Sequence, residues 1–275
     1  GSNAGHLVSG SRDKTVIVWS LETASKALTL CGHTEQVMCT AVAADGRIFS
    51  ASLDGTCRVW RDGTCAEVLQ GHQGSVLCVL PLPNGTVLTG SQDNTVKCWN
   101  GTECISTIPA HSDSVRCLAL YPEVGLISGS HDTTLKLWSF DGAPLATMTG
   151  HTSLVYSVAC TAEGMIVSAS EDKTARVWRP DGSCLQTIPH PLDVWAVTLL
   201  PNGDIATGCA DSVARIWSQA EERRAPADAI AAYNQAVQER AAGSSSNNSS
   251  GGVQAEGPEA LQFPGTNDGQ TKVIR

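Results

Sequence analysis

Residues 71–99 read GHQGSVLCVLPLPNGTVLTGSQDNTVKCW, and this stretch decides the fold because the chain repeats its pattern. A Gly-His pair opens it, an Asp stands six residues before its end, and a Trp closes it. The Trp recurs at steps of 41, 39, 39, 40 and 39 residues, at Trp19, Trp60, Trp99, Trp138, Trp178 and Trp217. Self-similarity at a period of about 40 residues is typical of repeat architectures.

Two further residue types keep the same register as the Trp. An Asp stands six residues before every Trp, and a His stands 21 residues before each of the last five of these Asp residues. Three registers held over five copies are not a chance arrangement, so one structural unit is repeated. The Asp residues are Asp13, Asp54, Asp93, Asp132, Asp172 and Asp211, and the His residues are His33, His72, His111, His151 and His190.

Each copy reads as four short strands. A run that begins with Val follows the Gly-His pair, a turn such as Pro201-Asn202-Gly203 ends it, and a second run such as residues 126–130 comes next. A tight turn at the Asp leads to a third run that ends at the Trp, and a turn such as Asp181-Gly182 opens the fourth. Short β-rich runs joined by Asn-Gly or Asp-Gly turns predict antiparallel hairpins. Four strands in about 40 residues correspond to one blade of a β-propeller.

Over residues 5–218 the chain resembles the WD-repeat family, because the Gly-His start, the Asp and the closing Trp recur in register. Five copies are full, and a leading piece, Gly5 to Trp19, lacks its first strand. We therefore expect an all-β WD-repeat β-propeller with about five and a half blades. Most propellers of the family have seven blades, which favours part of a seven-bladed ring whose N-terminal chain is missing. The alternative is a first strand that is supplied irregularly.

The repeated polar residues could be read as a Ser–His–Asp hydrolase site. A catalytic triad occurs once in a chain, whereas this set occurs in five copies, and buried polar groups must be hydrogen-bonded. In the resembled family these side chains form a buried network that ties three strands together, so we expect a structural role and no enzyme. The predicted network comprises His33, Asp54 and Trp60; His72, Thr89, Asp93 and Trp99; His111, Ser128, Asp132 and Trp138; His151, Ser168, Asp172 and Trp178; and His190, Thr207, Asp211 and Trp217.

Charge and cysteine usage exclude other classes of function. The net charge is −9 and no Lys/Arg cluster occurs, which argues against nucleic-acid binding and favours partners with basic patches. No apolar run reaches 18 residues. The eleven cysteines form no zinc-type spacing, so we expect no metal and no cofactor. Cys39, Cys78 and Cys117 fall at one repeat position and read as small core residues.

The periodicity stops after Trp217. We expect a propeller over residues 1–218, a helical extension over 219–243 with its helix at 226–242, a flexible linker over 244–262, and the start of another domain at 263–275. Pro226 and Gly243 favour the two helix ends, and a Ser/Asn/Gly-rich run favours the linker. A stripe of Ile230, Tyr233 and Val237 indicates that the helix packs on the propeller.

The order of propeller, Ala-rich helix, linker and a last segment PGTNDGQTKVIR (264–275) resembles the phospholipase A-2-activating protein family. The resemblance implies that residues 263–275 open a truncated ubiquitin-binding domain. It also implies that an AAA ATPase segregase, valosin-containing protein, binds a C-terminal region beyond Arg275. We accordingly expect a non-catalytic, cytoplasmic and nuclear ubiquitin-binding adaptor in ubiquitin homeostasis and proteasomal degradation. The alternative is a generic WD-repeat scaffold of another multiprotein complex.

Two positions of the repeat vary freely while the framework residues do not. One follows the Val and the other precedes the Asp, and we expect both at one end of each blade. The variable residues are Met38, Leu77, Arg116, Tyr156 and Trp195 in the first position and Leu53, Gln92, His131, Glu171 and Ala210 in the second. We predict that ubiquitin docks here, with Trp195 and Tyr156 as apolar anchors, Leu77 and Met38 as further apolar surface, and Arg116, His131 and Glu171 as the polar surround. In the alternative, Trp195 and Tyr156 are core residues between blades.

Overall fold

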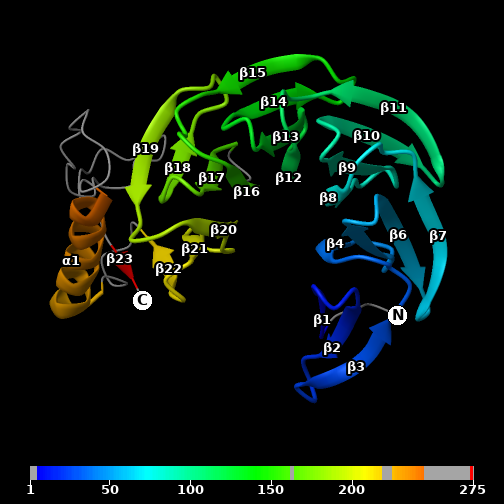
Figure 1. Ribbon diagram of the computed structural model, residues 1–275, viewed down its shortest axis with the longest axis horizontal. Coiled ribbons are helices and arrows are strands. Elements are labelled where there is room, and N and C mark those ends of the chain that lie inside the picture. The colour runs from blue at the N-terminus through cyan, green and yellow to red at the C-terminus, as the bar shows by residue number, and fades with distance from the viewer. Residues whose placement is uncertain (1–4, 162–163, 219–224, 245–272, 275) are drawn as a thin grey trace. The chain divides into compact units, whose positions relative to one another are not determined.

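The computed structural model describes residues 5–161, 164–218, 225–244 and 273–274 (Figure 1). Within these residues the chain forms six antiparallel sheets and one helix. The strands of the first three sheets are β1 (His6–Gly10), β2 (Val16–Ser20) and β3 (Ser25–Leu30); β4 (Val37–Val42), β5 (Ile48–Ser52), β6 (Thr56–Arg61) and β7 (Thr64–Gln70); and β8 (Val76–Pro81), β9 (Val87–Ser91), β10 (Thr95–Asn100) and β11 (Glu103–Pro109).

The last three sheets follow the same order along the chain. Their strands are β12 (Val115–Tyr121), β13 (Gly125–Ser130), β14 (Leu135–Ser139) and β15 (Pro144–Met148); β16 (Val155–Cys160), β17 (Ile166–Ser170), β18 (Thr174–Trp178) and β19 (Cys184–Pro189); and β20 (Val194–Leu199), β21 (Ile205–Cys209), β22 (Ala214–Trp217) and β23 (Val273–Ile274). Consecutive strands pair in every sheet except the last, whose fourth strand, β23, comes from the far end of the chain.

The predicted blade pattern is confirmed. Five sheets have four strands and the first has three, because the leading copy lacks its inner strand as the sequence indicates. A tight turn at each repeated Asp joins the second and third strands. At Asp54, for example, one carboxylate oxygen accepts the backbone N–H and the hydroxyl of Thr56, at 3.0 and 2.6 Å, which closes the turn. The residue after the Asp has a positive φ, as at Asn94 with 68°. The seven-bladed ring remains an expectation.

The structure divides into two compact units. The first comprises residues 1–120, 126–132 and 140–142, and the second residues 121–125, 133–139 and 143–275. In the first unit, Phe49 and Val59 of one sheet pack with Val76 and Val79 of the next. Phe49 is completely buried, and burial of such a side chain stabilises a fold by about 1.5–3 kcal/mol. The apolar core of this unit therefore lies between successive sheets.

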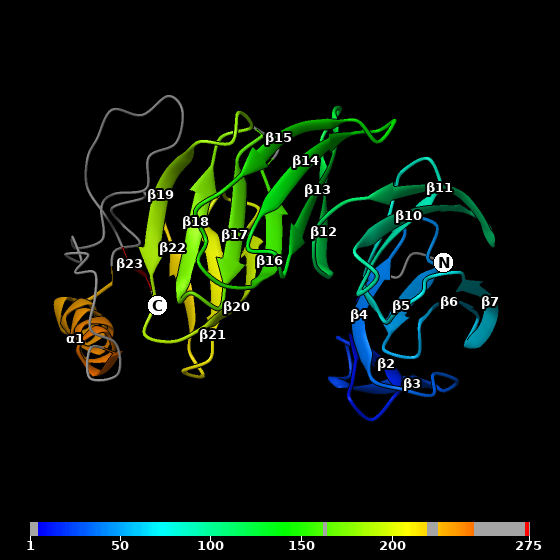
Figure 2. The same cartoon turned by 45° about the horizontal axis from the view of Figure 1, so that its top comes forward.

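The second unit repeats this packing and adds the helix. Val177 and Ile188 pack with Val194 and Val197 of the following sheet. Figure 2 shows the strands β16–β19 of one of these sheets. The helix α1 (Ala227–Ser244) joins the same cluster through Tyr233, which is 6% exposed. The predicted packing of the helix is thus confirmed.

The helix and the tail depart from the prediction in their bounds. The helix continues through Gly243 to Ser244, although glycine was expected to end it and Ser244 to begin the linker. Most of the predicted linker and most of the segment 263–275 lie outside the described residues. Val273 and Ile274 are described, and they pair with Trp217 and Ile216 of β22. A strand at this position was not predicted.

Candidate partner-binding face

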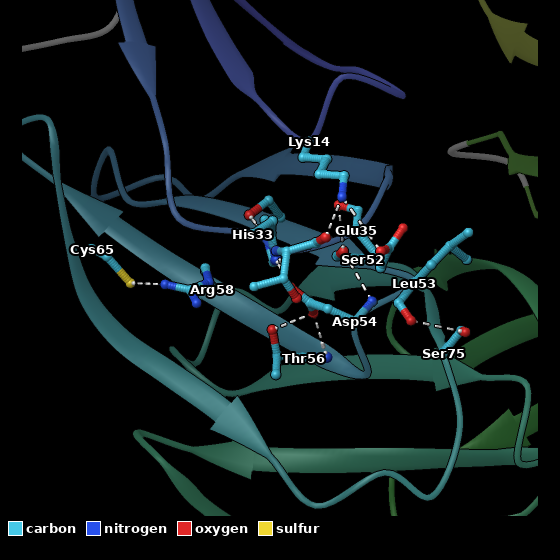
Figure 3. Close-up of polar contacts among 12 residues, drawn as sticks. Lys14, His33, Glu35, Ser52, Leu53, Asp54, Thr56, Arg58, Cys65 and Ser75 are labelled. Carbon is cyan, nitrogen blue, oxygen red and sulfur yellow. Dashed lines mark hydrogen bonds and ion pairs between the residues drawn. The ribbon is translucent and has the colours of Figure 1, made fainter.

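A buried hydrogen-bond chain from a His to an Asp and a hydroxyl recurs in the second to fifth sheets, and Figure 3 shows its His and Asp in the second sheet. His33 Nδ1 lies 2.7 Å from Asp54 Oδ2, and His33 Nε2 lies 2.7 Å from Ser50 Oγ. The indole N–H of Trp60 donates to the same Ser50 oxygen at 2.8 Å. Because the carboxylate only accepts, Nδ1 carries the proton and the hydroxyl donates to Nε2. Ser50 was missing from the predicted network, although it stands where the other copies have their Ser or Thr.

The chain recurs with the same geometry in later blades. His72 contacts Asp93 at 2.8 Å and Thr89 at 2.7 Å, and His151 contacts Asp172 at 2.7 Å and Ser168 at 2.6 Å. His111 likewise contacts Asp132 and Ser128, at 2.8 and 2.7 Å. The hydroxyl-bearing residues have no exposed surface, as at Ser168 with 0%. The hydroxyl that a hydrolase would use as nucleophile is therefore shut off from substrate, and the arrangement holds strands together.

The electrostatics of the network follow from burial and hydrogen bonding. Burial raises the pKa of Asp172, but donors on His151, Thr174 and the backbone outweigh it and lower that pKa from 3.8 to about 2. Burial lowers the pKa of His72 against the raising effect of Asp93. The equivalent donors outweigh burial in the same way at Asp93 and lower its pKa to about 2, so at neutral pH an ionised Asp93 faces a neutral His72 imidazole.

The last blade departs from the predicted network. His190 Nε2 contacts Thr207 at 2.9 Å as expected, but His190 Nδ1 contacts the carbonyl of Ile188 at 3.1 Å instead of Asp211. Asp211 instead forms an ion pair with Arg215, 2.6 Å apart. The prediction that His190 binds Asp211 is therefore wrong.

The sequence contains the reason. In the other blades the residue after the His donates its backbone N–H to the Asp, as Thr152 does to Asp172 at 3.1 Å. Here that residue is Pro191, which has no N–H. Two residues beyond the Asp, Val213 replaces the hydroxyl-bearing Thr. Besides the imidazole, Asp211 thus lacks two donors of the standard arrangement, and the guanidinium of Arg215 binds it instead.

The predicted face consists of β-bulges. The ladder between the first and second strands shifts register after the opening Val, which leaves one residue without a partner across the sheet. A bulge re-aims the side chain it carries. These extra residues are Met38, Leu77, Tyr156 and Trp195, four of the five predicted first positions.

The second predicted set lies at the same end of its sheets. The backbone N–H of the residue before each Asp donates to the carbonyl just before the bulged strand. The bonds join Leu53 to Gln36, Gln92 to Ser75, His131 to Ser114, Glu171 to Leu154 and Ala210 to Asp193. The residue types at these positions do not indicate a bulge. The sequence predicts the positions only because they vary from repeat to repeat.

In the first unit the face is partly closed. Leu77 is only 6% exposed, so the prediction that it offers apolar surface to a partner is wrong. Arg116 reaches across, and its guanidinium donates to the carbonyl of Leu77 at 3.4 Å. Met38, Arg116 and His131 are half-buried. In the first unit the predicted face thus carries Arg116 and Met38, and it lacks an exposed aromatic side chain at these positions.

In the second unit the two predicted anchors lie together. The rings of Tyr156 and Trp195 are stacked, with centroids 5.0 Å apart and planes 4° from parallel. Trp195 is 52% exposed, so it is not a core residue wedged between blades. Ser157 Oγ binds both the N–H and the carbonyl of Val197, at 3.2 and 3.3 Å, and this bridge ties together the strands that carry the two rings.

Glu171 adds a carboxylate at the same end of the second unit. It is half-buried, and one of its oxygens accepts the hydroxyl of Ser153 at 2.5 Å. We call Tyr156, Trp195 and Glu171 the aromatic platform. It combines a rigid apolar surface with a negative charge.

Other kinds of site receive no support within the described residues. No group of three or more His, Cys, Asp or Glu there is placed to hold a metal ion. No helix among the described residues is both long and apolar enough to cross a membrane. As predicted, Cys78 and Cys117 are buried, whereas Cys39 is half-buried. Burial raises the pKa of Cys117 to about 12, so it is an unreactive packing residue.

Comparison with known proteins agrees with this geometry. The family model of the WD domain, G-beta repeat, matches residues 2–20, 25–61, 63–100, 102–139, 142–179 and 182–218. The crystal structure of the WD40 β-propeller domain of Doa1 is similar, with a TM-score of 0.75 and 35% identity over 81% of this chain and 77% of that one.

Two curated relatives match over shorter stretches. Ubiquitin homeostasis protein lub1 of Schizosaccharomyces pombe is 38% identical over 93 residues, 34% of this chain and 13% of the relative. Phospholipase A-2-activating protein of Xenopus laevis is 34% identical over 94 residues, 33% of this chain and 12% of the relative. The matched stretches thus span about an eighth of each relative's length. The chain therefore belongs to the WD domain, G-beta repeat, family, and its relatives include Doa1, lub1 and phospholipase A-2-activating protein.

Proposed function

We propose that this chain is a non-catalytic adaptor that binds ubiquitin and acts in ubiquitin homeostasis and proteasomal degradation, in the cytoplasm and nucleus. The observation that carries the proposal is the exposed stack of Tyr156 and Trp195. The similarity to ubiquitin homeostasis protein lub1 supports the choice of partner. A contact with the AAA ATPase segregase remains an expectation from the family resemblance.

The physical fit rests on three properties of the aromatic platform. Trp and Tyr are enriched among the residues that dominate binding energy, because a rigid ring buries much apolar surface at little entropic cost. The Ser157–Val197 bridge ties together the two strands that carry the rings, so little conformational entropy is lost on binding. Glu171 and the net charge of −9 favour a partner whose apolar patch has a basic surround. We assign that patch to the exposed aliphatic surface of ubiquitin.

Calorimetric titration of ubiquitin into the wild-type chain and into Trp195→Ala tests the proposal. Loss of the anchor should weaken binding by about 2 kcal/mol or more, which is roughly a thirtyfold increase in Kd. The matched control is Phe140→Ala, since Phe140 is an aromatic residue of similar exposure, 57%, outside the platform. Its Kd should equal that of the wild type.

Three results would count against the proposal. Equal affinity of wild type and Trp195→Ala would move the site away from the platform. An equal loss in Phe140→Ala would indicate general apolar adhesion. The absence of heat with the wild type would leave the generic WD-repeat scaffold, with a different partner, as the function. The melting temperatures of both variants should equal that of the wild type, which excludes a loss of folding as the cause of weaker binding.

A further inference from the structure

Three Asn-Gly pairs lie at exposed turns of the chain, at Asn84-Gly85, Asn100-Gly101 and Asn202-Gly203. Such a pair can react with itself. The backbone nitrogen of the glycine attacks the side-chain carbonyl carbon of the asparagine, because glycine has no Cβ to block the approach. A five-membered succinimide forms and ammonia leaves, and water then opens the ring to aspartate or isoaspartate. Since the three pairs have the same two residues, the local hydrogen bonds decide which of them reacts.

The turn around Asn84 holds both reacting groups. Asn84 Oδ1 accepts the backbone N–H and the hydroxyl of Thr86, at 3.1 and 2.7 Å. The N–H of Gly85 donates to the carbonyl of Leu82 at 3.0 Å. To react, the carboxamide must rotate toward the glycine nitrogen, and that nitrogen must lose its proton. The bonds of this turn oppose both changes, and a reaction proceeds only when its two atoms are close and aligned.

The turn around Asn202 holds its carboxamide at both ends. Asn202 Oδ1 accepts the N–H of Asp204 at 3.1 Å, and Asn202 Nδ2 donates to the Asp204 carboxylate at 3.0 Å. Asp204 is 4% exposed, so its carboxylate is a fixed anchor. The N–H of Gly203 donates to the carbonyl of Leu200 at 2.9 Å. The carboxamide and the glycine nitrogen are thus restrained here as well.

The pair Asn100-Gly101 has none of these bonds. It opens the two-residue turn between β10 and β11, where Asn100 pairs with Glu103 across the ladder. Among the described residues, no group binds the carboxamide of Asn100 and no carbonyl accepts the N–H of Gly101. A Cβ placed on Gly101 would meet no atom within 4 Å, so the space around the turn is open. The carboxamide can therefore rotate, and the glycine nitrogen can lose its proton to water.

We propose that Asn100 is a deamidation site of the folded chain, and that the turns around Asn84 and Asn202 protect those two residues. The Gly101 nitrogen gives its proton to water and forms a bond to Asn100 Cγ. The bond from Cγ to the amide nitrogen then breaks, and that nitrogen takes up a proton and leaves as ammonia. Water adds to one of the two succinimide carbonyls and breaks its bond to the ring nitrogen. Water is the only co-reactant that this sequence of steps needs.

The product changes the outer edge of the third blade. It places a carboxylate at residue 100, opposite Glu103, and like charges that face each other destabilise a strand pair. The isoaspartate product also lengthens the backbone of the turn by one carbon atom. β11 is the outermost strand of its sheet and is exposed along almost its whole length. Deamidation should therefore loosen β11, while the inner strands of the sheet stay paired.

Incubation of the 275-residue chain at pH 8, with peptide mapping by mass spectrometry at intervals, measures all three rates in one sample. In the folded chain Asn100 should deamidate at least tenfold faster than Asn202, with Asn84 between them. In guanidinium chloride the three rates should lie within threefold of one another, because the unfolded chain has lost the protecting turns. Thr86→Val removes one bond to Asn84 and should raise the rate there at least threefold, with the rate at Asn100 unchanged.

Hydrogen exchange of the incubated protein tests the structural consequence. The amides of β11 should exchange faster in the incubated wild type than in incubated Asn100→Gln, whose longer side chain closes such a ring far more slowly. The matched control is β7, the outer strand of the preceding blade, whose exchange should be the same in both proteins. Asn100→Asp separates the two effects, because it carries the charge without the longer backbone.

Several results would overturn the proposal. One is equal deamidation of the three residues in the folded chain. Another is a preference for Asn100 that persists unchanged in guanidinium chloride, since the adjacent sequence and not the fold would then cause it. An unchanged rate at Asn84 in Thr86→Val would show that the turn bonds do not protect. Unchanged exchange of β11 after deamidation would refute the loosening of the outer strand.

Discussion

Replacing Asp172 by Ala tests the central structural claim, that the repeated His/Asp set stabilises the fold and does no chemistry. The carboxylate accepts hydrogen bonds from His151, the backbone of Thr152 and the hydroxyl of Thr174. An unmet buried donor costs about 1–3 kcal/mol, and the exposed backbone of Thr152 can bind water instead. We therefore expect the free energy of unfolding to fall by about 3 kcal/mol at pH 7.

The pH dependence gives a second magnitude. The pKa of Asp172 falls from 3.8 to about 2 on folding, and a difference of nearly two units corresponds to about 2 kcal/mol. Because the folded pKa is the lower one, this stabilisation is complete above pH 4–5 and is lost as the pH falls toward 2. The gap between wild type and Asp172→Ala should therefore shrink from about 3 to about 1 kcal/mol over that range.

Urea unfolding followed by tryptophan fluorescence, at pH 7 and at steps down to pH 2, measures both quantities. Asp211→Ala is the matched control, because Asp211 occupies the same repeat position but binds Arg215 instead of a His. It should cost less than Asp172→Ala, because the Arg215 and Asp211 side chains keep 11% and 17% of their surface exposed and the freed guanidinium can bind water. The reasoning would be refuted if the two variants lost equal stability, or if the Asp172→Ala gap did not change with pH.

Three further outcomes are expected. Burial lowers the pKa of His190 from 6.5 to about 4. The free energy of unfolding should therefore be highest above pH 6.5 and decline as the pH falls toward 4. A flat pH profile identical to that of His190→Gln would contradict this. Tyr233 packs edge-on against Trp217, with ring centroids 5.5 Å apart, so Tyr233→Ala should release α1 and speed its proteolysis without lowering ubiquitin affinity. Iodoacetamide at pH 8 should label exposed Cys104 and spare buried Cys117, as peptide mass mapping would show.

Much of the fold follows from the sequence, because the repeated residues act locally. The Trp–Ser/Thr bond spans ten residues and the His–Asp contact spans 21, so the spacing of residue types already defines each blade. The helix was also predictable, since Tyr233 lies on a visible apolar stripe. Its end was not, because Gly243 is compatible with a helix as well as with its end.

The site could be predicted only in outline. Variability between the repeats identified the bulge positions. The exposure of each bulged side chain, however, depends on which residues of neighbouring strands pack against it, and the sequence does not show these contacts. Leu77 and Trp195 occupy equivalent bulges, yet one is 6% and the other 52% exposed. The failure at Asp211 was avoidable, because Pro191 and Val213 each remove a donor that the other copies supply. Strand β23 was not foreseeable, since it pairs residues separated by more than 50 positions.

The short span of the His–Asp contacts also bears on how the chain folds. Each network closes a loop of about 20 residues, and closure of a short loop loses little chain entropy. A blade can thus fold largely through contacts within its own sequence, and the next blade can then pack against it. Stability should accordingly add up along the chain as in a one-dimensional array, with nearest-neighbour coupling between blades. Damage to one blade should then appear in hydrogen exchange as a local opening, with distant blades still protected.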